Sequence, residues 1–427
     1  MPTNKKHITI FEHQSLKLNQ EIGGVRFDAY KLKALQRYYG EKGVPYFSLI
    51  HNGIRFNNFV GVIQVGNIIL EVLPKADNIF TENEEKAQWH KILIDMLFEV
   101  GFFDVQSPSN SSLKLKPNAI LDLYFELFIK EIEYLLHIGL VKKYRKKEGN
   151  VSALKGSLKF ARHIQQNLTH QERFYVSHTN YDVEHKLHQI LYKAIKLLSQ
   201  INSNSGLQSR IGALLLHFPE MVDIKVNEAT FNTLTLTRKT LSYEKAINIA
   251  KLLLLQFHPD VSQGRNDVLA IMFDMNKLWE RFVFKSLKRN KSLSVKAQVS
   301  KHFWQSSEGD LSKMRPDIIV EKGEQTFVVD TKWKNLKGYN PSPEDLRQMF
   351  VYHEYYAAQK VALVYPNKEN NTLRGNYLSP ETRKVLEKEC SIISIAISSK
   401  VDNERLVKTW QKDIESKFTF WIETSNG

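Results

Sequence analysis

The chain contains a single cysteine, Cys390, among its 427 residues. One cysteine cannot form a disulfide within the chain, nor can it build a zinc or iron–sulfur site that needs several thiolates. This usage is typical of a reducing compartment, so we expect a cytoplasmic protein. Because Cys390 lies beside the apolar run Ile392-Ile393-Ser394-Ile395, we expect a buried structural thiol.

Long apolar runs are absent as well. Residues 1–12 have no apolar core, so the sequence predicts no secretory signal peptide. The most apolar stretch, residues 246–257, is interrupted by Lys251 and is too short to cross a bilayer, so we expect a core helix and no membrane partner. No glycine belongs to a Gly-x-x-x-x-Gly-Lys-Ser/Thr loop, which excludes a P-loop NTPase.

Positively charged residues outnumber negatively charged ones. The chain has 60 Lys and Arg against 46 Asp and Glu, a formal net charge of +14. Such an excess favours a polyanionic partner, although many basic proteins bind nothing acidic. The basic stretch at residues 142–147, with Tyr144 inside it, is suited either to gripping a nucleic-acid backbone or to forming a solvated loop between helices.

The length and the order of the patterns predict a multidomain α+β protein. Residues 1–110 are β-rich with Gly and Asn turn signals, which favours a small barrel or sandwich. Residues 111–257 form a helical middle region, and residues 258–427 form an α/β domain. The best linker-like patch lies at residues 202–206.

Periodicity places individual elements inside these three regions. The first region contains strands at 8–11, 53–56, 60–67 and 68–75 and a helix at 84–100, and the second contains helices at 120–140, 185–198 and 243–257. The third contains helices at 274–288 and 343–357, with strands at 295–303, 316–321, 326–334, 360–365 and 391–398.

Two of these strands each carry a carboxylate. Asp317 opens the apolar run Ile318-Ile319-Val320, and Asp330 ends the run Phe327-Val328-Val329. Lys332 lies two residues after Asp330 and therefore points to the same face of the sheet. Two carboxylates, with the carbonyl of Thr331 as a further ligand, are suited to Mg²⁺ or Mn²⁺, and an ammonium group beside them can offset charge on a phosphodiester. The pattern predicts a metal-dependent nuclease site.

The spacing acid-x-Lys is weak evidence taken alone. It recurs at Glu84-Glu85-Lys86, Glu184-His185-Lys186, Asp223-Ile224-Lys225 and Glu415-Ser416-Lys417. Only the Asp330 copy ends an apolar run and has an acid opening a second such run upstream. The alternative is an Asp at a strand edge paired with Lys332 in a surface salt bridge, which contributes little stability.

Three other residues are candidates for the same site. Gln348 and Tyr352 are spaced i, i+4 on the predicted helix at 343–357 and share one face, from which they can orient the substrate or Lys332. Glu280 is a charged residue among Leu278, Trp279 and Phe282, so it is a candidate metal or water ligand, or else an exposed helix glutamate.

This arrangement resembles the PD-(D/E)xK nuclease superfamily. Pro316-Asp317 matches its first element, Asp330-Thr331-Lys332 its second, and Gln348 to Tyr352 the Gln-x-x-x-Tyr element of its RecB-like branch. Further upstream the chain is similar to McrC, the nuclease subunit of McrBC-type modification-dependent restriction systems. That similarity involves Ile10-Phe11-Glu12-His13, Val72-Leu73-Pro74-Lys75, Leu154-Lys155-Gly156-Ser157-Leu158-Lys159-Phe160, His163 and Asn167.

The resemblance implies an N-terminal domain that docks into a hexameric McrB-like AAA+ GTPase and stimulates its hydrolysis. It also implies a C-terminal domain that cuts double-stranded DNA, with Asp317, Asp330 and Lys332 as catalytic residues. Since the chain lacks a P-loop of its own, the motor would be another subunit, and a double-strand break would require two nuclease domains to pair. Two alternatives stay open: a stand-alone RecB-like repair nuclease and a non-catalytic nucleic-acid-binding adaptor.

Overall fold

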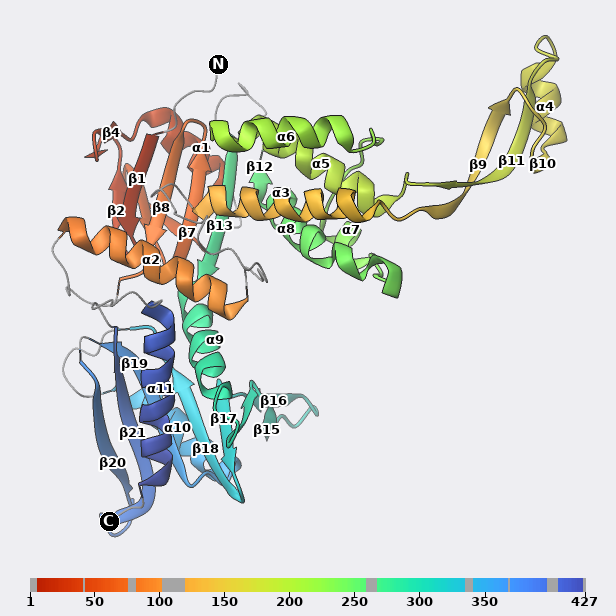
Figure 1. The fold of residues 1–427 in the computed structure, drawn as a ribbon. Coiled ribbons are helices and arrows are strands. Elements are labelled where there is room, and N and C mark those ends of the chain that lie inside the picture. Colours follow the sequence, from red (N-terminus) through yellow and green to blue (C-terminus); the bar gives the residue numbers. More distant parts are fainter. Residues whose placement is uncertain are drawn as a thin grey trace. The chain divides into compact units, whose positions relative to one another are not determined.

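Figure 1 shows the chain as a computed structural model. The structure describes residues 6–40, 43–75, 82–101, 120–258, 267–334, 341–367, 369–397 and 406–424. The chain divides into two compact units, one made of the described residues from 120 to 271 and the other of those from 6 to 101 and from 272 to 424. The protein is therefore of mixed α and β structure, while the three-domain division at residues 110 and 257 stays a prediction.

The N-terminal part of the second unit contains the predicted strands. Its elements are β1 (Lys6–Phe11), β2 (Ser15–Lys17), β3 (Glu21–Ile22), β4 (Val25–Arg26), α1 (Ala29–Tyr39), β5 (Phe47–Ile50), β6 (Gly53–Phe56), β7 (Phe59–Val65), β8 (Ile68–Leu73) and α2 (Glu82–Val100). Strand β8 pairs in parallel with β1 and antiparallel with β7, and every residue of β8 is buried. Helix α1 was not expected, although Asp28 caps it by accepting a hydrogen bond from the Lys31 amide.

The first unit is mainly helical, as predicted, with a projecting pair of long strands. Its elements are α3 (Ile120–Ile138), β9 (Lys143–Val151), β10 (Ser157–Leu158), α4 (Phe160–Asn167), β11 (Phe174–Asp182), α5 (Lys186–Ile201), α6 (Ser205–His217), α7 (Glu228–Asn232), the 3₁₀ helix η1 (Arg238–Tyr243), α8 (Glu244–Gln256), β12 (Phe257–His258) and β13 (Val268–Asp274), which continues into the second unit. Residues 202–204 connect α5 to α6, residues 205 and 206 begin α6, and the whole patch lies within this unit rather than between the two units.

Strands β9 and β11 form an antiparallel ribbon that we call the arm (Figure 1). The basic stretch at 142–147 lies mostly in β9, so the alternative of a loop between helices is wrong, although the stretch is largely exposed to solvent. Strand β10 pairs with β11, and Gly156 beside it has φ +72° and lies so close to β11 that an added Cβ would be 2.3 Å from the Ser177 carbonyl oxygen. The end of the arm with α4 therefore depends on a glycine at this position.

Buried polar groups hold the root of the arm. The Tyr243 hydroxyl accepts a hydrogen bond from the Val141 amide at 2.9 Å and lies 2.9 Å from Nε2 of the fully buried His188. Nδ1 of His188 lies 2.5 Å from the Val183 carbonyl oxygen, so Nδ1 is the donor and Nε2 accepts from Tyr243. Burial, and then the charge of His185, lowers the pKa of His188 to about 4. A neutral imidazole thus joins the two ends of the arm to α5 and η1.

The C-terminal part of the second unit contains the predicted α/β pattern. Its elements are α9 (Met275–Lys288), β14 (Ser294–Ala297), β15 (Lys301–Gln305), β16 (Leu311–Met314), β17 (Ile318–Lys322), β18 (Gln325–Thr331), α10 (Pro343–Tyr355), β19 (Lys360–Asn367), β20 (Asn371–Leu378), β21 (Val385–Ala396) and α11 (Leu406–Glu423). The six-stranded sheet has the order β14-β17-β18-β19-β21-β20. The single strand expected at 295–303 is two strands, since Gln298 between them has φ +52°. Strands β16 and β20 and helix α11 were not expected.

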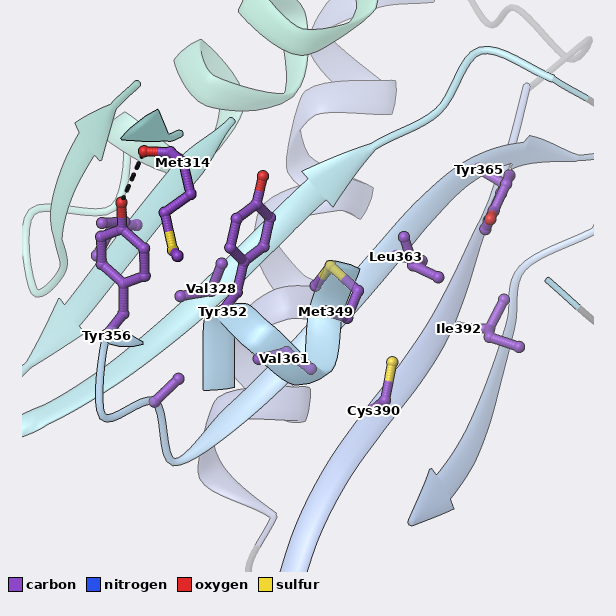
Figure 2. Close-up of a cluster of buried hydrophobic side chains, with 12 residues drawn as sticks. Met314, Val328, Met349, Tyr352, Tyr356, Val361, Leu363, Tyr365, Cys390 and Ile392 are labelled. Atoms are coloured by element: carbon purple, nitrogen blue, oxygen red, sulfur yellow. Dashed lines mark hydrogen bonds between the residues drawn. The ribbon is translucent and has the colours of Figure 1, made fainter. Parts of the chain in front are cut away.

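Strands β18, β19 and β21 run parallel, and they are apolar because both faces of the sheet are covered. On one face α10 packs its buried Met349 and Tyr352 against Val328, Val361 and Leu363 (Figure 2). Cys390 is buried in the same cluster and is free, and burial raises the pKa of its thiol to about 11, as expected for a structural thiol.

Tryptophan side chains pack on the other side of this sheet. Trp279 of α9 lies 5.5 Å from Trp333 and 5.4 Å from Trp410 of α11, measured between ring centroids. Its indole nitrogen donates to the Val364 carbonyl of β19. Such rings bury a large area and fix the helices on the sheet. Among the helices in the described ranges, none is long and apolar enough to span a membrane.

Candidate active site

The ends of β17 and β18 bring the two predicted carboxylates together. These strands pair antiparallel with Ile318 opposite Val329, which sets Asp317 beside the end of β18. The backbone amide and the hydroxyl of Thr331 both donate to Oδ2 of Asp317, at 2.7 and 2.8 Å. Asp317 therefore has a fixed orientation. The contacts of Thr331 use its amide and hydroxyl groups, and its predicted role as a carbonyl ligand stays a prediction.

Asp330 is almost completely buried, with 3% of its surface exposed. Burial, and after it the negative charge of Asp317, raises its pKa to about 7. The ammonium of Lys332 lies 2.7 Å from its Oδ2 and acts in the opposite direction. The site thus holds two carboxylates close enough to repel each other, with one lysine beside them. This is a buried acidic centre and not the exposed strand-edge salt bridge of the alternative interpretation.

Helix α10 presents Gln348 and Tyr352 to the same lysine. Nζ of Lys332 lies 3.4 Å from Oε1 of Gln348, and Nε2 of Gln348 donates to the Tyr352 hydroxyl at 2.7 Å. Burial raises the pKa of Tyr352 to about 12, so the phenol stays protonated at neutral pH. Of the two roles predicted for this pair, the contacts favour orientation of the lysine.

Asp345 also belongs to this site, although it was not among the predicted site residues. One of its carboxylate oxygens lies 3.6 Å from Nζ of Lys332, and the other lies 2.6 Å from Nζ of Lys334 and 3.4 Å from the Tyr365 hydroxyl. Asp345 is buried, and although burial alone would raise its pKa, hydrogen bonds from Lys334 and from the Ser342 hydroxyl lower it. Its spacing of three residues before Gln348 places it on the same helix face, which was the signal available in the sequence.

Glu280 is connected to Asp317 by Gln298, a residue that the sequence did not indicate. Its Oε1 accepts a hydrogen bond from Gln298 at 2.7 Å, and the Gln298 amide donates to the Asp317 carbonyl at 3.0 Å. Burial, and then the charge of Asp317, raises the pKa of Glu280. Gln298 therefore connects Glu280 to the backbone of Asp317, in a left-handed conformation that no local pattern predicts.

The residue after Lys332 is anchored to the N-terminal strands of the same unit. The indole nitrogen of Trp333 donates to Oε1 of Glu12 at 2.7 Å, and the Lys75 amide donates to the same oxygen at 2.9 Å. Burial raises the pKa of Glu12 to about 7. Trp333 also lies against Trp89 of α2 at 6.4 Å between centroids. The end of β18 and the two residues after it are thus held on one side by Asp345 and Gln348 and on the other by Glu12 and aromatic packing.

The donor chemistry fits a hard divalent cation. The buried Oδ2 of Asp330, with Lys332 as its ion-pair partner, faces the charge of Asp317, and a cation between the carboxylates would relieve that repulsion. In the described part of the chain no group of three or more His, Cys, Asp or Glu side chains is placed to hold a metal ion. Mg²⁺ does not need such a group, because it keeps several waters and uses one or two carboxylates together with substrate phosphate.

The overall fold is similar to that of a chain in a solved restriction assembly. This assembly is a half-complex of Thermococcus gammatolerans McrB AAA+ hexamers with bound McrC, and the match covers 96% of this chain and 100% of the other, with 19% identity and a TM-score of 0.68. A cryo-EM structure of the McrBC complex from the same organism matches over 67% of this chain and 88% of the other, with 20% identity and a TM-score of 0.49. The first of these similarities shows that the two chains share a fold.

The family follows from the sequence itself. The family model described as McrBC 5-methylcytosine restriction system component matches residues 54–366, and the chain belongs to this family. The predicted membership in the McrC family is thereby confirmed. No curated protein matches the chain at a significant level.

Proposed function

We propose that the protein is the Mg²⁺-dependent DNA endonuclease subunit of an McrBC-like restriction complex. The observation that carries this proposal is the meeting of Asp317 and Asp330 at one end of paired strands, with the Lys332 ammonium 2.7 Å from Asp330. Such a centre combines a site for a hard cation with a positive group for the phosphate, which is what phosphodiester hydrolysis requires.

Each residue has a defined part in this proposal. Asp317 and Asp330 hold the cation, with the Thr331 carbonyl and Glu280 as further candidate ligands, and Mn²⁺ is an acceptable substitute for Mg²⁺. When bound, the cation neutralises phosphate oxygens and acidifies the attacking water. Lys332 orients that water and offsets developing negative charge. Gln348, supported by Tyr352, and Asp345 fix the position of Lys332.

A partner surface is suggested by the end of the arm. Phe160 and Ile164 of α4 and Leu168, which follows the helix, are spaced i, i+4 and i+8 and are 70%, 61% and 73% exposed. The adjoining side of the helix, formed by His163 and Asn167, is fixed to the arm, because Asn167 donates hydrogen bonds to Asn150 and to the Arg173 carbonyl, and the Tyr175 amide donates to His163. A helix that exposes its apolar face is expected to bind another protein.

We propose that this partner is an McrB-like AAA+ GTPase, since the similar structures hold McrC bound to McrB AAA+ hexamers. The end of the arm is then a docking surface besides the predicted one in residues 1–110. Stimulation of GTP hydrolysis and the pairing of two nuclease domains for a double-strand break belong to the same proposal.

The test uses the chain co-purified with its AAA+ partner. Wild-type complex should cut DNA when Mg²⁺ and GTP are both added. Asp330→Asn should abolish cutting while the complex assembles and hydrolyses GTP as before. Combined Phe160→Ser and Ile164→Ser substitutions should instead reduce the amount of partner that co-purifies with the chain.

Two outcomes would favour the alternatives. Efficient cutting by the purified chain without partner or GTP indicates a stand-alone nuclease. DNA binding without metal binding or cutting, in the presence of the partner, indicates an adaptor. Wild-type cutting by Asp330→Asn would refute the site assignment.

A further inference from the structure

The two-stranded ribbon formed by β15 and β16, residues 301–314, has no role in the proposed chemistry, yet it leads directly into Arg315-Pro316-Asp317. Among the residues that the structure describes, its two strands pair only with each other, outside the six-stranded sheet. All five residues of β15 are exposed. An isolated ribbon of this kind is marginally stable in water, so its persistence needs either an anchor or a partner.

The ribbon does have an anchor, at its root. The Tyr356 hydroxyl donates to the Val299 carbonyl at 2.7 Å and lies 3.4 Å from the Met314 carbonyl, the contact drawn in Figure 2. The Tyr355 hydroxyl lies 3.3 Å from the Phe303 carbonyl, and Nζ of Lys301 donates to the Tyr355 carbonyl. Tyr355 ends α10, the helix that carries Gln348 and Tyr352. The ribbon is therefore held in a fixed position beside the candidate active site.

The part beyond the anchor exposes large apolar groups. Trp304 is 55% exposed, Leu311 opposite Gln305 is 51% exposed, and Phe303 is 46% exposed. The register shifts between His302 and Trp304, so Phe303 is the extra residue of a β-bulge. Bulges near active sites commonly change the direction of a side chain or the curvature of a strand. A fixed ribbon that keeps a tryptophan in solvent is expected to be a binding element.

The charges on the ribbon are arranged along its length. Lys313 and Arg315 are exposed on the strand that leads to Asp317, whereas Glu308 and Asp310 lie in the turn at the far end. The positive charge is thus nearest to the candidate catalytic centre, and a polyanion that reaches Asp317 would pass along this strand. The acidic turn would be directed away from the phosphates.

We propose that the β15–β16 ribbon lies in a groove of duplex DNA next to the strand to be cut. Lys313 and Arg315 contact phosphates, and Trp304 packs on the sugars and base edges that line the groove. The major groove admits a two-stranded β-ribbon. This inference rests on the proposed nuclease function. It names the surface that places the scissile phosphate at Asp317 and Asp330.

The test is a binding measurement that does not depend on cutting. The full chain is titrated into a fluorescently labelled duplex with Ca²⁺ in place of Mg²⁺. Trp304→Ala should raise Kd by about tenfold, the size expected for loss of one aromatic contact, with an unchanged dependence of Kd on salt. Trp304→Phe should restore most of the affinity. Lys313→Gln should weaken binding and reduce the slope of log Kd against log salt by about one, because one phosphate contact is lost.

Leu378→Ala provides the matched control. Leu378 is 61% exposed on β20, at the opposite edge of the sheet from β14, and its truncation should leave Kd unchanged. The proposal is overturned if Trp304→Ala binds DNA like Leu378→Ala, or if wild type shows no binding. It is also overturned if Trp304→Ala alters only self-association in sedimentation, because the ribbon would then contact a second copy of the chain.

The two proposals fail in distinguishable ways. If Trp304 and Lys313 variants lose DNA affinity while wild-type complex never cuts with Mg²⁺ and GTP, the ribbon inference stands and the nuclease function falls. If the complex cuts and Asp330→Asn does not, while the ribbon variants bind normally, the reverse holds.

Discussion

The candidate active site and the root of the arm each bury an ionisable group, but the two groups differ in their hydrogen bonds and in their neighbouring charges. His188 at the root of the arm has both ring nitrogens in hydrogen bonds and its pKa is lowered to about 4, so it is buried in its neutral form. Asp330 lies beside a second carboxylate and has a pKa raised to about 7, so at neutral pH a substantial fraction carries a charge that its surroundings disfavour.

This difference separates a structural site from a functional one. A buried polar group with all its hydrogen bonds made fixes the fold. A buried carboxylate held against another is unfavourable until a cation or a proton arrives, and residues of that kind cluster at functional sites. Four predictions test the contrast, and they are given from the largest expected effect to the smallest.

The first is Asp330→Asn. Loss of the carboxylate should reduce DNA cutting by about 10³-fold, the scale found when one electrostatic group is removed from an active site. Without metal, the same substitution should raise the melting temperature at pH 8, because it removes the repulsion with Asp317. Cleavage and melting assays on one preparation check both effects. A variant that loses activity and stability together would mean that Asp330 is structural.

The second concerns His188. Its contribution to the free energy of unfolding is fully present above pH 6.5 and is lost as the pH falls toward 4, since only the unfolded chain takes up the proton. The loss between pH 7 and pH 5 should be about 2 kcal/mol. Hydrogen exchange in peptides from α3 and α5, corrected for the intrinsic effect of pH, measures it.

His188→Phe should be less stable at pH 7 but should lack this pH-dependent part. His217→Gln, which changes an exposed imidazole in the same unit, is the control and should keep it. Identical pH dependence in wild type and His188→Phe would contradict the assignment.

The third concerns metal binding. Asp330 must lose its proton to bind a cation, so Mg²⁺ affinity should rise with pH up to about 7 and then level off. The gain from pH 6 to pH 8 should be about tenfold. Calorimetry of Mg²⁺ or Mn²⁺ binding to the full chain checks this, with proton release below pH 7 as a second signal. Affinity that is flat over this range would mean that Asp330 is not a ligand.

The fourth is Tyr352→Phe. The change removes the acceptor of the Gln348 amide group and loosens the positioning of Lys332, but it leaves both carboxylates in place. We expect kcat to fall by only about threefold to tenfold, in line with the loss of one neutral hydrogen bond. Lys332→Met should cost far more. Equal losses in the two variants would show that Tyr352 does more than orient.

The sequence predicted the parts of the fold that depend on local pattern. Asp317, Asp330 and Lys332 could be grouped because strand periodicity fixes which side chains share a face, and the apolar runs marked the strands. Gln348 and Tyr352 followed from helical spacing, and Asp345 could have been added in the same way.

Other parts depend on contacts that are distant in the sequence. Gln298 can join Glu280 to Asp317 because its own backbone, directly after β14, has the left-handed conformation. No sequence pattern indicates this conformation. The arm was missed because β9 is polar and solvated on both faces, so it lacks the alternation of a half-buried strand. Helix α11 is amphipathic, but its role is defined by Trp410 and Trp421 packing on other elements.

The hydrogen bond from Trp333 to Glu12 has a consequence for engineering. The Trp333 side chain, next to the candidate catalytic lysine, donates a hydrogen bond to Glu12, which directly follows β1 and lies 321 positions away. A fragment of residues 272–427 would lack Glu12, the acceptor of the Trp333 indole, and would expose the side of Trp333 that packs on Trp89. Chimaeras between related proteins should therefore exchange the N-terminal strands and the part from α9 onward together.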